Sequence, residues 1–125
     1  MTPNNAVFRD MYIICQQYAD VYEYAPDSHA KYPFIWLDND RLDEQMNNDL
    51  IGSATHTIRI YGRLTDRKAL DDIATNIHND LRRLKGSFGY SLNLTSFSMQ
   101  TIKENSNGTP LLHYSVDVSF LYNKK

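Results

Sequence analysis

Four histidines and several carboxylates are the residues of this chain whose side chains could do chemistry. The hydrophobic patterns described below place His29 between elements, His56 and His113 on strands, and His78 on a helix. No two of them have the i, i+4 spacing of a helical zinc site, and the single cysteine, Cys15, cannot complete a zinc cluster. The sequence therefore predicts no metal centre.

A catalytic interpretation would rest on His56, His113 and Asp117. These residues could meet if two neighbouring strands brought them together across a sheet. Packed or solvated strand residues are the simpler interpretation. The chain also has no Gly-x-Ser-x-Gly elbow and no glycine-rich phosphate loop. Adjacent carboxylates such as Asp71 and Asp72 point apart on a helix, which argues against an acid–base pair. We predict no enzyme and no cofactor, and keep a small enzyme as an alternative.

The segment 38–49 is the clearest break in composition. It holds five acidic residues and one basic residue, so its net charge of −4 is larger in magnitude than the −2 of the whole chain. Asp38 and Asp40 begin like a calcium loop, but Leu42 and Asp43 stand where a ligand and a glycine are needed, which excludes an EF-hand. We predict a solvated contact loop here, since long loops in compact domains are usually functional. Together with a predicted hairpin tip, the candidate contact residues are Asp40, Arg41, Asp43, Glu44, Asn105, Asn107 and Gly108.

The composition is typical of one folded domain that spans residues 1–125. The chain has 42% hydrophobic residues, which is enough for a core without disulfides. Its acidic balance argues against a protein that binds nucleic acid by neutralising phosphates. The lone Cys15 points to a reducing compartment or to a fold that is indifferent to the redox state of its compartment. We expect neither a signal peptide at residues 1–5 nor a membrane span, because no apolar run approaches about 20 residues.

Hydrophobic periodicity predicts three elements in the first half of the chain. Residues 5–22 carry apolar side chains at helical spacing, and Asn4 or Asn5 could cap this helix. Residues 34–37 form a strand with apolar side chains on both faces, which indicates cover from both sides. Residues 52–61 alternate with period two and predict a second strand.

The second half predicts a helix and a hairpin. The helix begins at Thr65 or Asp66 and stops at Gly86. Its apolar stripe is Leu70, Ile73, Ala74, Ile77, Leu81 and Leu84. The first hairpin strand changes face near Thr95, which implies a bulge, and the return strand carries apolar side chains on one face from residue 112 to residue 122. These patterns predict an α+β fold, with an antiparallel or mixed sheet of about four strands and two helices on one face, in the order α-β-β-α-β-β.

Aromatic residues gather between the first helix and the first strand. We expect Tyr22, Phe34 and Trp36 to pack the helix on the sheet. Tyr24 and Tyr32 lie at the ends of a connecting segment, where an interface role and simple packing are both open.

The order of these features resembles the tail-terminator, or tail-completion, proteins of long-tailed bacteriophages, often called minor capsid proteins. The resemblance rests on Val-Tyr-x-Tyr-x-Pro at residues 21–26, Tyr-Pro-Phe-Ile-Trp-Leu at 32–37, a Thr-rich strand at 55–61 and Leu-x-x-Ile-Ala-x-x-Ile at 70–77. It covers nearly the whole chain. The acidic segment departs from the family, in which a glycine turn often follows the 32–37 block.

This resemblance implies a hexameric ring that caps the growing tail tube and joins it to the head connector. The protein would then lie at the tail–head junction of a virion assembled in the host cytoplasm. Its partners would be further copies of itself, the tail-tube protein and the head-completion or connector protein, with DNA passing through the lumen without specific binding and no membrane involved. A head-completion or adaptor protein of the connector is the second hypothesis, and the small enzyme is the third.

Overall fold

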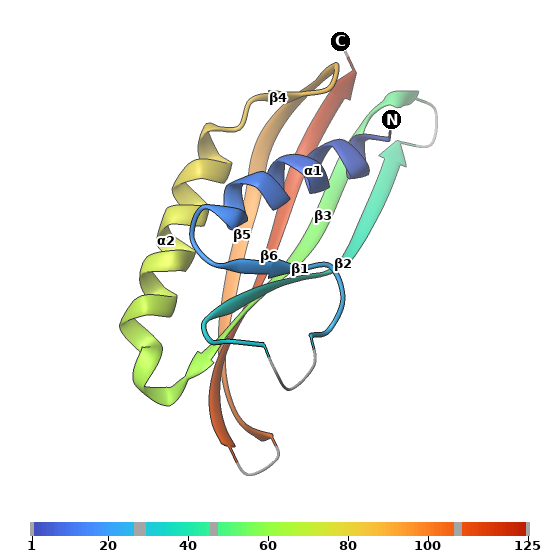
Figure 1. Cartoon of the computed structure of the whole chain (residues 1–125). Coiled ribbons are helices and arrows are strands. Elements are labelled where there is room, and N and C mark those ends of the chain that lie inside the picture. Colours follow the sequence, from blue (N-terminus) through green and yellow to red (C-terminus); the bar gives the residue numbers. More distant parts are fainter. Residues whose placement is uncertain (1, 27–29, 46–47, 107–108, 125) are drawn as a thin grey trace.

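The computed structural model describes residues 2–26, 30–45, 48–106 and 109–124. Within these ranges the chain forms one six-stranded sheet in the strand order β1-β2-β3-β6-β5-β4, and two helices pack over one of its faces (Figure 1). The elements in chain order are α1 (Pro3–Gln16), β1 (Asp20–Tyr22), β2 (Phe34–Gln45), β3 (Asn48–Arg63), a 3-10 turn η1 (Leu64–Asp66), α2 (Arg67–Arg83), β4 (Gly86–Ser87), β5 (Tyr90–Ser106) and β6 (Thr109–Lys124).

The predicted α+β fold with about four strands in the order α-β-β-α-β-β is wrong. Two short strands, β1 and β4, extend the sheet at its edges, and β1 runs parallel to β2 while every other neighbouring pair is antiparallel. With three and two residues, they are too short to show an alternating hydrophobic pattern. They form because the long neighbouring strands offer backbone groups that need partners.

The core lies between the two helices and the face of the sheet that they cover. Every residue of the predicted apolar stripe of α2 is buried except Leu84, which is half-buried and follows the helix. The predicted apolar face of β6 is also confirmed. Its buried residues are Leu112, Tyr114, Val116, Val118, Phe120 and Tyr122. The expected bulge appears as a shift in pairing between Leu94 and Ser96 of β5.

Helix α1 is shorter than its apolar stripe suggests. It begins at Pro3 because the Thr2 hydroxyl accepts a hydrogen bond from the backbone amide of Asn5 at 3.1 Å, so neither Asn4 nor Asn5 is the cap. It ends at Gln16, after which the chain turns into β1. Tyr22 therefore lies on a strand, half-buried, and does not pack a helix on the sheet. The periodicity continued past the helix because β1 also has a partly buried face.

The described part of the segment predicted as an acidic loop lies on strands, residues 38–45 on β2 and residues 48–49 on β3. Strand β2 continues to Gln45. It pairs with β3 along this segment, with Asp40 opposite His56 and Glu44 opposite Gly52. Long-range pairing with β3 outweighs the weak strand propensity of aspartate and asparagine in this segment. The two long hairpins point in opposite directions. The β2–β3 hairpin lies at the end of the molecule that holds both termini, and the β5–β6 hairpin lies at the other end (Figure 1).

No helix among the described residues is long and apolar enough to span a membrane.

Candidate assembly surface

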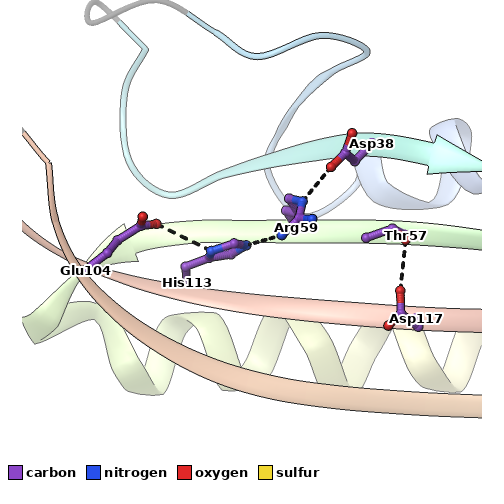
Figure 2. A network of polar contacts seen from close by, with 6 residues as sticks. All are labelled: Asp38, Thr57, Arg59, Glu104, His113 and Asp117. Carbon is purple, nitrogen blue, oxygen red and sulfur yellow. Dashed lines mark hydrogen bonds and ion pairs between the residues drawn. The ribbon is translucent and has the colours of Figure 1, made fainter.

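The face of the sheet that the helices leave open carries a chain of polar contacts from β2 to β5 (Figure 2). Arg59 of β3 donates from Nε to Oδ2 of Asp38 on β2 at 2.6 Å, and its Nη1 lies 3.4 Å from Nε2 of His113 on β6. His113 Nδ1 in turn lies 3.4 Å from Oε1 of Glu104 on β5. These contacts tie four neighbouring strands together across one face.

The surroundings of His113 change the pKa of its imidazole. Its side chain is only 5% exposed, and this burial, with the charge of Arg59, lowers the pKa of the imidazole, while Glu104 acts in the opposite direction. A neutral ring can accept a hydrogen bond from Arg59 at Nε2, while Nδ1 lies beside the Glu104 carboxylate. Burial therefore favours the neutral form of the imidazole, which lies between the Arg59 guanidinium and the Glu104 carboxylate.

An aromatic row crosses the same face and buries the histidine. Phe34 of β2 stacks on Tyr61 of β3 with ring centroids 5.0 Å apart, and Tyr61 stacks on His113 at 4.1 Å. Tyr32 also stacks on Phe34, with ring centroids 5.4 Å apart, and Tyr22 meets Phe34 edge to face at 5.7 Å. Tyr32 therefore packs within its own chain. Phe34 is buried without a helix above it because aromatic neighbours cover it.

Hydroxyl groups line the neighbouring part of this face. Thr57 donates to Oδ1 of Asp117 at 2.8 Å across β3 and β6 (Figure 2), and Thr55 lies 3.0 Å from the Ser119 hydroxyl. These pairs are cross-strand contacts of the kind that stabilise a sheet. They leave a polar surface rather than an apolar one.

The predicted contact residues are placed as follows. Asp40, Arg41, Asp43 and Glu44 lie on β2, where all four are exposed and Arg41 Nε pairs with Oδ2 of Asp43 at 2.9 Å. Asn105 lies near the end of β5, and Asn107 and Gly108 fall outside the described residues. The structure thus separates the two predicted contact regions to opposite ends of the sheet (Figure 1).

The structure does not assemble the catalytic alternative. His56 pairs with Val118, and its side chain is on the helix-covered face with Ile58 and Ala54. His113 and Asp117 are on the open face. Period-two geometry therefore keeps His56 away from the other two residues. No group of three or more His, Cys, Asp or Glu side chains within the described ranges could hold a metal ion.

The sequence did not single out Arg59 or predict the contacts that it makes with Asp38 and His113. The alternation of β3 already places Arg59 on the face opposite to Ile58 and Ile60. Its partners Asp38 and Glu104 could not be found in this way, because Asp38 was assigned to a loop and strand pairing is not visible in the sequence.

His56 makes stability depend on pH. Burial lowers the pKa of this imidazole from 6.5 to about 4, although Asp40, 4.0 Å from Nδ1, opposes the shift. The unfolded chain binds a proton below pH 6.5 that the folded chain does not, so this contribution to stability is present above pH 6.5 and is lost as the pH falls towards about 4. This group alone lowers the free energy of unfolding by about 2 kcal/mol between pH 7 and pH 5.

Urea titrations across this range test the prediction. His56→Leu is expected to flatten the pH dependence, whereas His78→Leu, at a half-buried position on α2, leaves most of it in place. An unchanged slope in His56→Leu would show that His56 does not stay neutral in the folded protein.

No protein-family model and no curated protein sequence matches this chain. Among solved structures, a chain from the virion of a native gene transfer agent particle has the same fold, with a TM-score of 0.60. The alignment covers 99% of this chain and 96% of that chain at 10% sequence identity. At this identity the likeness establishes a shared fold, and it does so over the full length of both chains.

Proposed function

We propose that this protein is a structural component of a phage-type virion, a ring-forming protein that terminates the tail tube and joins it to the head connector. The observation that carries this proposal is the full-length structural match to a chain of a gene transfer agent virion. The more specific assignment as a tail terminator rests on the sequence motifs between residues 21 and 77, among them the Tyr-Pro-Phe-Ile-Trp-Leu block at residues 32–37. The protein acts by assembly and has no catalytic role.

The two ends of the sheet support a joining role. A protein between tube and connector needs two contact surfaces that face away from each other. The end of the β2–β3 hairpin, with Asp43, and the end of the β5–β6 hairpin, with Asn105, lie at opposite ends of the molecule (Figure 1). We assign one end to the tube and the other to the connector.

The open face of the sheet supports contact with passing DNA. Its polar network holds three carboxylates, Asp38, Glu104 and Asp117, against one guanidinium, Arg59 (Figure 2). A network with this excess of carboxylates does not favour the binding of phosphates. In a ring, this face would let DNA slide through the lumen.

Light scattering coupled to size-exclusion chromatography tests the ring. The expected result is a species of about six chains, formed either alone or together with the tail-tube protein of the same virion. A monomer at high concentration, both alone and with that tube protein, would contradict the proposal.

The adaptor hypothesis stays open because the match names a virion and not a position in it. Pull-down with purified tube and connector proteins separates the two roles. Binding to both favours the terminator, and binding to the connector alone favours the adaptor.

A further inference from the structure

We propose that neighbouring copies of this chain join edge to edge, with the free edge of β2 in one copy pairing with the free edge of β5 in the next. The partner is a second copy of this chain, so the inference rests on the proposed ring and names the surfaces that close it. It assigns Asp40 and Glu44 to the contact between copies and leaves the hairpin ends to the tube and the connector.

The sheet has a long unpaired edge on each side. At one side, β1 pairs with β2 only from Phe34 to Trp36. At the other side, β4 pairs with β5 only at Tyr90 and Ser91. In the described part of the chain no strand covers the rest of either edge. Natural proteins normally protect such edges, and uncovered edges are sites of strand addition.

The directions of the strands suit this pairing. Each of the pairs β2–β3, β3–β6 and β6–β5 is antiparallel, so β2 and β5 run in opposite directions within one chain. A second copy related by rotation about an axis along the strands would place its β2 antiparallel to β5. The antiparallel order of the strands then continues from one copy to the next. The contact joins two different edges, so it is heterologous, as ring closure requires.

Side chains on the β2 edge make it acidic on the helix-covered side. Beyond a shift in pairing after Leu37, Asp40 pairs with His56 and Glu44 pairs with Gly52, which places both acids on the side of the buried His56. Asp38 is already bound by Arg59 on the other side. Asp40 and Glu44 are therefore the carboxylates that an added strand would present next to a helix.

The β5 edge offers basic side chains on the same side. Grooves between α2 and β5 are lined by Arg67 and Lys68 near one end of the helix and by Arg82 near the other, with Met99 on the strand between them. Asp71 is the acid that lines these grooves.

The apolar lining of the β5 edge also suits a partner. Met99 is 44% exposed, and Phe97 is held by a stacked His78 with ring centroids 3.9 Å apart. When β2 of the next copy pairs with β5, its Asp40 and Glu44 lie near the basic side chains of α2. The added strand also covers the exposed Met99.

Charge reversal on each edge gives a sharp test by light scattering. The β2 variant is Asp40→Lys with Glu44→Lys, and the β5 variant is Lys68→Glu with Arg82→Glu. Each variant alone brings like charges together, so the concentration for half-assembly is expected to rise at least about tenfold. An equimolar mixture of the two restores assembly, because each reversed edge then meets its opposite. Asp10→Lys with Glu23→Lys makes the same charge change on the first helix and the segment after β1, and is expected to assemble as the wild type does.

Two results separate failure of this inference from failure of the ring. If the wild type assembles and both reversed variants assemble at the same concentration, the edge pairing is wrong while the ring stands. If the wild type is monomeric under every condition, with tube protein present, both proposals are wrong.

In hydrogen exchange, amides of residues 38–44 and 95–105 are expected to gain protection only on assembly. Protection confined to other segments would overturn the pairing.

Discussion

Replacing Gly52 with valine is expected to lower the free energy of unfolding by about 3 kcal/mol or more. A Cβ atom at this position would lie 2.5 Å from the hydroxyl oxygen of Tyr122 and closer still to the carbonyl oxygen of Asp43. Tyr122 is fully buried and Asp43 contributes a backbone atom, so neither can move away easily. Strand propensity alone predicts the opposite sign, because valine favours strands and glycine does not. Urea denaturation measures the difference.

Ser53→Val is the matched control for this variant. Ser53 is the next residue of β3, on the opposite face of the sheet and half-buried, and the substitution is expected to change stability by no more than about 0.5 kcal/mol. Equal stability of the two variants would show that Tyr122 does not lie over Gly52.

Arg59→Met is expected to lower the free energy of unfolding by about 2 to 3 kcal/mol. The guanidinium pairs with Asp38 at 2.6 Å, contacts His113 at 3.4 Å and lies 5.8 Å from the centre of the Trp36 ring. The side chains of Arg59 and Asp38 are 28% and 16% exposed, so removing the cation leaves a largely buried carboxylate without its charge partner.

The comparison with Arg41→Met isolates the effect of burial. Arg41 also pairs with an aspartate, Asp43 at 2.9 Å, but these side chains are 75% and 52% exposed. An exposed pair contributes about 0.5 kcal/mol or less, so this variant is expected to be nearly as stable as the wild type. Equal losses in the two variants, measured by chemical denaturation, would contradict a stabilising network on the open face.

Local patterns were sufficient for the elements that have one buried face. The stripe of α2 and the alternation of β6 predicted their core residues, since both follow directly from the period of the backbone. The change of face near Thr95 also predicted the bulge, because a pleated strand cannot switch faces without an extra residue.

Features that depend on distant partners could not be predicted in this way. The acidic part of β2 is a strand because β3 pairs with it, and no residue within the segment signals that pairing. Tyr22 lies on a strand because β2 runs beside it. The network around Arg59 needs the register of four strands, which sequence periodicity does not specify.

We propose a ring of this protein on the end of a tail tube. Electron microscopy of the tail-tube protein of the same virion, polymerised with and without this chain, can show such a ring. The expected result is tubes whose growth stops when the chain is added, with a ring visible at one end. Tubes that keep growing without any density at their ends would contradict the claim.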